Sequence, residues 1–125
     1  MQKLAIVLTA HGTKDPKDSA VVFEYSQELE QLLNLPIYTG FGEFIQPSTL
    51  TALLQAAQKG ANKIVLLPYF LFSSPHTMQD LENYIQQFHQ SYPDTLVIKA
   101  NPIGKHALIP QILKDRFQEA FLKNS

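Results

Sequence analysis

Imidazole and carboxylate side chains recur at corresponding places along this 125-residue chain. His11, Glu43, His76 and His106 each come shortly after an apolar, β-rich run of the kind that forms a buried strand. If these runs are strands of one parallel sheet, their carboxyl ends meet at a single edge, which is where such sheets bind ligands. We therefore expect three histidines and one carboxylate to converge on one rim of the fold.

Two imidazoles and a carboxylate without cysteine are suited to a divalent metal ion. Neutral imidazole is the commonest protein ligand of first-row divalent metals, and a carboxylate can serve as a further ligand or as a proton acceptor. A site made by His11, His76 and Glu43 would leave coordination positions open. The pattern predicts an open metal site rather than a closed structural one.

A histidine in a loop after a strand can also be a surface residue or a helix cap. We assign His106 to the start of the last helix. His89 lies near the C-terminal end of a predicted helix, where a cation interacts favourably with the helix dipole. His11 and His76 keep the functional interpretation because they follow strands that can be neighbours in the sheet. Glu43 is included because an acid beside phenylalanines usually has a partner or a chemical role.

Other catalytic motifs are missing from the sequence. Ser73 and Ser74 do not belong to a G-x-S-x-G nucleophile elbow. The stretch "AHGTKDP" has one glycine where phosphate-binding and dinucleotide-binding loops need two or three. Pro68 and Tyr69 stand where a phosphoaspartate receiver would place its aspartate. Cysteine is absent, which excludes disulfides, thiolate metal sites and a cysteine nucleophile.

Composition excludes several partner classes. The net charge is −1 and no cluster of Lys or Arg occurs, so we expect neither nucleic acid nor a membrane surface as a partner. No apolar run approaches the roughly 18 residues of a membrane span, and the first residues are too short for a signal peptide, so a cytoplasmic protein is expected. The charged fraction of 17% is low, and a second copy of the chain could cover part of the surface.

Hydrophobic periodicity predicts four strands that alternate with four helices in one domain over residues 1–125. The predicted strands are 4–9, 37–41, 63–72 and 95–100. The predicted helices carry apolar stripes at Val22, Tyr25, Leu29, Leu32 and Leu33; at Leu50, Leu53, Leu54 and Ala57; at Met78, Leu81, Ile85 and Phe88; and at Leu108, Ile109, Ile112, Leu113, Phe117 and Phe121. This order indicates an α/β three-layer sandwich with a four-stranded parallel sheet, right-handed crossovers and helices on both faces. The run 63–72 is apolar on both alternating faces and should be central.

Four stretches of the chain resemble the short CbiX-type chelatases. They are "AHGTKDP", "GFGEFIQPSTLTALLQAAQKGANKIVLLPYFL", "FLFSSPHTMQD" and "NPIGKHALI", and they match in order over nearly the whole chain. The resemblance implies one half of a class II chelatase fold, acting as a homodimer. It also implies that the enzyme inserts a divalent metal into sirohydrochlorin, a tetrapyrrole with many carboxylates.

The resemblance also assigns roles to individual residues. His11 corresponds to a metal ligand and proton acceptor, His76 to the second metal ligand, and Glu43 to an acid that lines the cleft, and these are the expected catalytic residues. Substrate contacts are expected from Thr13, Gln46, Leu71, Phe72, Ser73, Ser74 and Pro75. The sequence departs from the family where Ser74 replaces a common glycine, where Lys14 replaces a frequent arginine, and where Gln46 replaces an acid.

The expected function is therefore that of a sirohydrochlorin cobaltochelatase of cobalamin or siroheme-type biosynthesis. The metal is a substrate, with Co²⁺ first and Fe²⁺ or Ni²⁺ as alternatives, and no organic cofactor is expected. A non-catalytic metal or tetrapyrrole carrier and a plain interaction domain with surface histidines are the alternatives of other classes.

Overall fold

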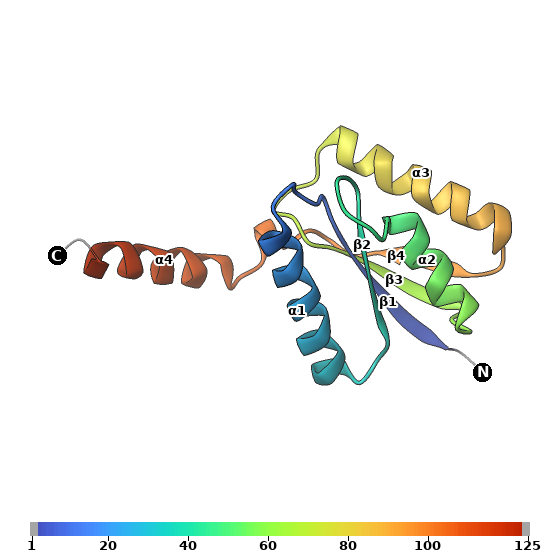
Figure 1. The fold of residues 1–125 in the computed structure, drawn as a ribbon, viewed down its shortest axis with the longest axis horizontal. Helices are drawn as coiled ribbons and strands as arrows, with labels where there is room; N and C mark the ends of the chain where they lie inside the picture. Colours follow the sequence, from blue (N-terminus) through green and yellow to red (C-terminus); the bar gives the residue numbers. More distant parts are fainter. Residues whose placement is uncertain (1–2, 124–125) are drawn as a thin grey trace.

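The computed structural model describes residues 3–123, and its centre is a parallel sheet (Figure 1). Its strands are β1 (Leu4–Ala10), β2 (Ile37–Phe41), β3 (Lys63–Pro68) and β4 (Leu96–Lys99). They lie in the order β2-β1-β3-β4, and each neighbouring pair is parallel. The predicted parallel sheet is confirmed, and β3 holds the central position that its apolar sequence indicates.

Each of the first three long helices begins at a residue suited to capping. These helices are α1 (Pro16–Leu33), α2 (Thr49–Gln58) and α3 (Pro75–Ser91). Asp15, Ser48 and Ser74 accept hydrogen bonds from backbone N–H groups in the first turn of α1, α2 and α3. The short 3₁₀ helix η1 (Ile103–Lys105) and α4 (Ile109–Lys123) complete the chain.

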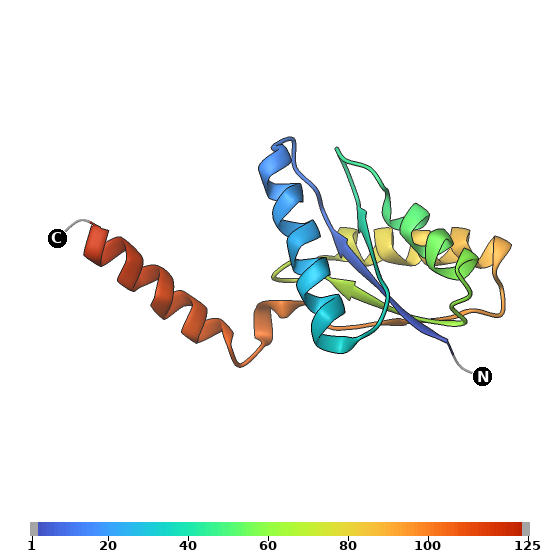
Figure 2. The same cartoon turned by 60° about the horizontal axis from the view of Figure 1, so that its bottom comes forward.

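The three helices α1, α2 and α3 divide between the two faces of the sheet (Figures 1 and 2). The larger core lies under α2 and α3, where Leu53, Leu66 and Phe88 are fully buried. The smaller core lies under α1 and contains Val22 and Phe41. Since both faces carry helices, the predicted three-layer arrangement is confirmed for these elements.

The third strand is shorter than the sequence predicts. The run 63–72 was expected to be extended throughout, but β3 ends at Pro68. Beyond that point the carbonyl groups of Phe70 and Leu71 accept hydrogen bonds from Ile103 and Gly104 at 3.2 and 2.7 Å. The segment 69–72 therefore pairs with η1 instead of continuing beside β4.

The last helix does not cover the sheet. In both views α4 extends away from the body of the domain, and none of its residues is buried (Figures 1 and 2). Its apolar stripe exists as the sequence predicts, but it faces solvent in a single copy. No helix within residues 3–123 combines the length and hydropathy needed to cross a membrane.

Candidate active site

Backbone hydrogen bonds join the loops that follow β1 and β2 at the carboxyl edge of the sheet. The N–H of Gly42 donates to Ala10 at 2.9 Å, and the N–H of Glu43 donates to the carbonyl of His11 at 2.8 Å. Gly12 has a φ of +87°, and a Cβ atom there would lie 2.1 Å from the carbonyl oxygen of Glu43. Glycine is needed at this position because only glycine allows both the left-handed backbone and the close approach. The loops thus bring His11 and Glu43 together, as predicted.

The imidazole of His11 packs against an aromatic ring at the end of β3. Its centroid lies 5.0 Å from that of Phe70, with an angle of 31° between the rings. The His11 residue is solvent-exposed, which leaves the imidazole accessible to a ligand. It also lines a cavity of about 300 Å³ whose other lining residues include Gly12, Thr13, Val22, Phe41 and Tyr69.

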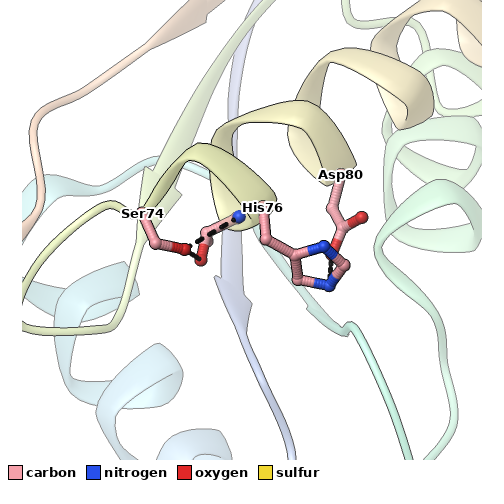
Figure 3. Close-up of polar contacts among 4 residues, drawn as sticks. Ser74, His76 and Asp80 are labelled. Carbon is pink, nitrogen blue, oxygen red and sulfur yellow. Dashed lines mark hydrogen bonds and ion pairs between the residues drawn. The ribbon is translucent and has the colours of Figure 1, made fainter.

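The second predicted ligand, His76, lies in the first turn of α3. Its side chain is 84% exposed, and its Nε2 atom lies 3.4 Å from a carboxylate oxygen of Asp80, one turn along the helix. Figure 3 shows the His76 ring turned toward Asp80, beside the helix start that Ser74 caps. A carboxylate in this position can orient an imidazole and raise its basicity, as such partners do for metal-binding histidines.

Asp80 and Tyr84 connect this helix to the loop that carries His11. Both line a small cavity of about 20 Å³ together with His11 and Gly42. Burial raises the pKa of the Tyr84 phenol, and the negative charges of Asp80 and Glu43 raise the pKa further. The carboxylates of Asp80 and Glu43 therefore both influence the Tyr84 phenol, which lies between the segment that carries His11 and the helix that carries His76.

Sequence reasoning missed Asp80 and Tyr84, although a signal was present. His76, Asp80 and Tyr84 follow one another at intervals of four residues, which places them along one face of a helix. The apolar stripe Met78, Leu81, Ile85 and Phe88 predicts this helix, and the polar residues lie on the neighbouring face.

The described residues do not form a complete metal cage. Within residues 3–123, no group of three or more His, Asp or Glu side chains is arranged to hold a metal ion. His11 and His76 remain the candidate metal ligands, and Glu43 reaches the rim through the backbone contact with His11. A metal ion held by two imidazoles would keep several positions for water or for an incoming substrate.

Thr13, one of the predicted substrate contacts, forms hydrogen bonds with residues at the start of α1. Its hydroxyl donates to the Asp18 carboxylate at 2.8 Å and accepts from the N–H of Asp15 at 3.1 Å. The same hydroxyl also lies within donating distance of the Asp15 carbonyl oxygen, at 3.3 Å, so Thr13 supports the loop after His11, and its contact with a substrate stays a prediction.

The remaining predicted contacts differ in what they offer. Leu71 and Phe72 are 55% and 64% exposed, so they present apolar surface at the rim. Ser73 lines a cavity of about 400 Å³ with Asn101 and Lys105 among its other residues. The other three are Gln46, which is exposed and precedes a cis proline, and Ser74 and Pro75, which form the start of α3.

The remaining two histidines have the structural roles assigned to them. The Nδ1 atom of His106 accepts a hydrogen bond from the N–H of Leu108 at 3.1 Å, just before α4 begins. The Nε2 atom of His89 lies 2.8 Å from the carbonyl oxygen of Thr95, which ties the end of α3 to the approach to β4.

The fold, with one histidine in the loop after β1 and another in the first turn of α3, is a parallel-sheet α/β domain with an open site at its carboxyl edge. A family model named CbiX matches residues 5–120. A protein of Saccharolobus islandicus named sirohydrochlorin cobaltochelatase is 30% identical over 127 residues, covering 97% of this chain and 98% of the relative. The chain therefore belongs to the CbiX family, and this membership assigns it to the metal chelatases.

Solved structures share the fold. A putative cobalamin biosynthesis CbiX protein from Marinobacter aquaeolei VT8 superposes with a TM-score of 0.79 and 22% identity, covering 98% of this chain and 99% of that one. The sirohydrochlorin chelatase SirB from Bacillus subtilis subspecies spizizenii, in complex with cobalt, has a TM-score of 0.88 and 20% identity. This chain is covered to 94% and spans 51% of SirB, so it corresponds to one half of that longer protein.

Proposed function

We propose that this protein inserts a divalent metal ion, in the first instance Co²⁺, into sirohydrochlorin. The observation that carries the proposal is that His11, in the loop after β1, and His76, in the first turn of α3, are both exposed at the carboxyl edge of a CbiX-family sheet. The name of the Saccharolobus islandicus relative supports the choice of metal and tetrapyrrole. Cobalamin or siroheme-type biosynthesis is the pathway in which such a product would be used.

The two imidazoles present the metal to the ring in this proposal. Insertion exchanges water ligands of the ion for ring nitrogens, so the protein must hold the ion through few ligands and release it. His11 and His76 meet this requirement because only one ligand comes from the loop after β1 and only one from the first turn of α3. Asp80 orients His76 from one turn further along α3, and packing against the tilted Phe70 ring orients His11.

Metal insertion also releases two protons from the pyrrole nitrogens. His11 and Glu43 are the proposed acceptors, because the backbone contact between their loops holds them together at the exposed rim. An exposed position lets them pass the protons to water after each turnover.

The tetrapyrrole would contact the apolar rim and the polar groups around it. Leu71 and Phe72 supply exposed apolar surface for the macrocycle. Ser73, Asn101 and Lys105 line the adjoining cavity and can donate hydrogen bonds to peripheral carboxylates. Thr13 stays a proposed contact, and its hydroxyl would have to exchange Asp18 for a substrate carboxylate.

Replacing each proposed metal ligand tests the assignment. Purified wild type, His11→Ala and His76→Ala would be incubated with sirohydrochlorin and Co²⁺, Fe²⁺ or Ni²⁺ in turn, and insertion followed by absorbance. We expect both variants to lose insertion while keeping the circular dichroism spectrum of the wild type. His106→Asn is the matched control, because it removes an imidazole from the same edge but retains a side-chain acceptor for the start of α4. Insertion at the wild-type rate by either alanine variant would reject the site.

The pH dependence gives a second test of the metal ligands. Imidazole must lose its proton before it can bind a metal ion, so the insertion rate should fall as the pH decreases below neutrality. The rate would be measured from pH 5 to 8 at constant ionic strength. An unchanged rate over this range would contradict imidazole ligation.

A non-catalytic carrier is the alternative that keeps the same site. Ser74, at a position where the family commonly has glycine, is the sequence feature that favours a carrier, but Ser74 has a φ of −111°, which any residue can adopt. The serine also caps α3, so the substitution does not distort the loop. Stoichiometric metal binding without insertion in the same assay would favour the carrier.

A homodimer completes the proposal, because this chain spans about half of SirB. Two copies facing each other would enclose a tetrapyrrole that one open rim leaves exposed.

A further inference from the structure

One residue at the rim of the candidate site has a strained backbone. Phe44 has a φ of +70°, in the left-handed region that a bulky side chain rarely adopts. The N–H of Ile45 donates to the carbonyl of Glu43 at 2.9 Å, so Phe44 is the central residue of a γ-turn. Within residues 3–123 the other non-glycine residue with a positive φ is Asn34, which ends α1 as an ordinary left-handed helix cap. The strain at Phe44 therefore needs an explanation of its own.

The residues on both sides of Phe44 hold the turn in place. The N–H of Glu43 donates to the carbonyl of His11 at 2.8 Å, and Ile45 packs against the smaller core under α1. With both neighbours fixed, the turn leaves the Phe44 residue 62% exposed. A strained residue that its surroundings hold in place is typical of a ligand-binding site, because folding alone gains nothing from an exposed phenylalanine in a strained turn.

A cation lies over the exposed ring of Phe44. The Nζ atom of Lys14 is 5.5 Å from the centroid of this ring, which is within the range of a cation–π contact. Lys14 is itself exposed, and among residues 3–123 no carboxylate forms an ion pair with it. The rim thus presents an apolar ring and an unpaired positive charge side by side. A ligand that matches both has a flat apolar body and carboxylates at its edge.

The sheet topology places this pair on one side of His11 and Phe72 on the other. The strand order is β2-β1-β3, so the loop after β1 lies between the loop after β2 and the segment after β3. Neighbouring strands are about 5 Å apart, so the two outer segments are separated by about 10 Å, a span that a four-ring macrocycle covers. Phe44 and Phe72, which are 62% and 64% exposed, can therefore contact one macrocycle that lies over His11.

We propose that Phe44 and Lys14 bind the tetrapyrrole on the β2 side of the site: Phe44 contacts the macrocycle, and Lys14 binds a carboxylate at its periphery. The inference rests on the proposed function, since it takes sirohydrochlorin as the substrate. Lys14 exchanges the Phe44 ring for the carboxylate when the substrate arrives, because a charge-assisted hydrogen bond is stronger than an exposed cation–π contact. Neither residue is a proposed metal ligand, so the pair contributes to the affinity for the tetrapyrrole and leaves metal binding unchanged.

Binding of metal-free sirohydrochlorin tests the pair separately from metal insertion. Wild type and variants would be titrated at low ionic strength and binding followed by absorbance. We expect Phe44→Ala and Lys14→Gln each to weaken binding by about tenfold. Phe44→Tyr should bind like the wild type because it keeps an aromatic ring, and so should Lys17→Gln, which removes an exposed charge from the first turn of α1. Unchanged binding by Phe44→Ala and Lys14→Gln, or an equal loss in Lys17→Gln, would overturn the proposal.

Steady-state insertion gives a readout that a purely structural role would not produce. Phe44→Ala and Lys14→Gln should raise the KM for sirohydrochlorin while kcat and the KM for Co²⁺ stay close to the wild-type values, because the lost contacts contribute to substrate binding in general. The affinity of the wild type should fall as salt is added, and that of Lys14→Gln should fall less, since one charge pair has been removed. A lower kcat with an unchanged KM for sirohydrochlorin would contradict a binding role.

The variant Phe44→Gly separates the strained backbone from the aromatic contact. Glycine adopts a positive φ without steric cost, whereas alanine does not. We therefore expect Phe44→Gly to unfold at a higher urea concentration than Phe44→Ala, although both lose affinity for sirohydrochlorin. A lower unfolding midpoint for the glycine variant would show that the turn is not strained, and the inference would lose its first observation.

The failure of this inference can be told apart from the failure of the proposed function. His76→Ala should bind metal-free sirohydrochlorin like the wild type, although it loses metal insertion. If the wild type inserts metal and Phe44→Ala and Lys14→Gln bind sirohydrochlorin as tightly as the wild type does, only the role of the pair is overturned. A wild type that binds no sirohydrochlorin would overturn the proposed function and the role of the pair with it.

Discussion

The two proposed metal ligands are held in different ways, although both are exposed. His11 lies in a loop whose backbone is tied to the next loop, and its ring rests against Phe70. His76 lies on a helix and is oriented by Asp80 at 3.4 Å. The position of His11 therefore depends mainly on loop geometry, and the orientation of His76 depends mainly on one carboxylate.

Gly12→Ala should separate loop geometry from ligand chemistry. The added Cβ atom would meet the Glu43 carbonyl oxygen at 2.1 Å in a left-handed backbone conformation, so the two loops must move apart. We expect a loss of about 1–3 kcal/mol in the free energy of unfolding, measured with urea, and a loss of metal insertion. Gly42→Ala is the control: its nearest neighbours lie 3.5 Å or more away, so it should stay close to the wild type. Equal effects of the two substitutions would contradict this account of the loop.

The titration of Tyr84 should report the charge of Asp80. Burial, Asp80 and Glu43 all raise the pKa of this phenol above 10.0, so phenolate forms at higher pH than in a free tyrosine. The ultraviolet difference between wild type and Tyr84→Phe should therefore show a phenolate that appears only above pH 10. Asp80→Asn removes one negative charge and should shift this component to lower pH, whereas Asp94→Asn, beyond the end of α3, should not. If the Tyr84 phenolate of Asp80→Asn appeared at the same pH as in the wild type, the Asp80 carboxylate would not act on Tyr84.

The candidate site could be predicted from the sequence where it depends on the ends of strands. His11 and Glu43 follow β1 and β2 directly, so the parallel order of the sheet is enough to bring their loops together. The role of Thr13 could not be predicted, because its hydroxyl has two partners, Asp15 and Asp18, that become neighbours only when the helix forms.

Among the elements, the start of α3 explains a departure from the family pattern. Ser74 accepts a hydrogen bond from the N–H of Thr77 at 3.1 Å and lies in an extended conformation. A serine is favoured here by its capping side chain, and glycine would be tolerated without being required. Serine at this position therefore stabilises the start of the helix that carries His76.

Substitutions at Ser74 should follow the order for a helix N-cap. Ser74→Ala should lower the free energy of unfolding by about 1 kcal/mol, and Ser74→Gly, the family's common residue, by only a few tenths. Urea denaturation measures both, with Ser73→Ala at the neighbouring exposed position as the control. A larger loss for glycine than for alanine would indicate that Ser74 does not act as a cap.

The elements themselves were predictable to different degrees. Strong periodicity identified the four strands and four helices, because each carries an apolar face or stripe, even though α4 leaves its stripe exposed. The end of β3 was not predictable from the run 63–72, since its last residues bond to η1, a distant element with no apolar pattern of its own. The stripe of α4 predicted a helix with an apolar face but could not show which surface that face contacts.

At the scale of the whole molecule, the proposed homodimer links stability to association. If two copies of the chain associate in the folded state, the folded dimer is favoured by mass action over unfolded chains. The melting temperature of the wild type should therefore rise with protein concentration, by on the order of 5 °C over a hundredfold range. Differential scanning calorimetry at a series of concentrations measures this dependence.

Two variants of α4 provide the controls for that measurement. Gln118→Glu should keep the concentration dependence, because Gln118 lies outside the apolar stripe of α4 that contains Phe117. Phe117→Glu places a charge on this exposed stripe, so it should weaken association and melt at a temperature that depends less on concentration. A melting temperature of the wild type that did not change with concentration would mean that association contributes nothing to the stability of the fold.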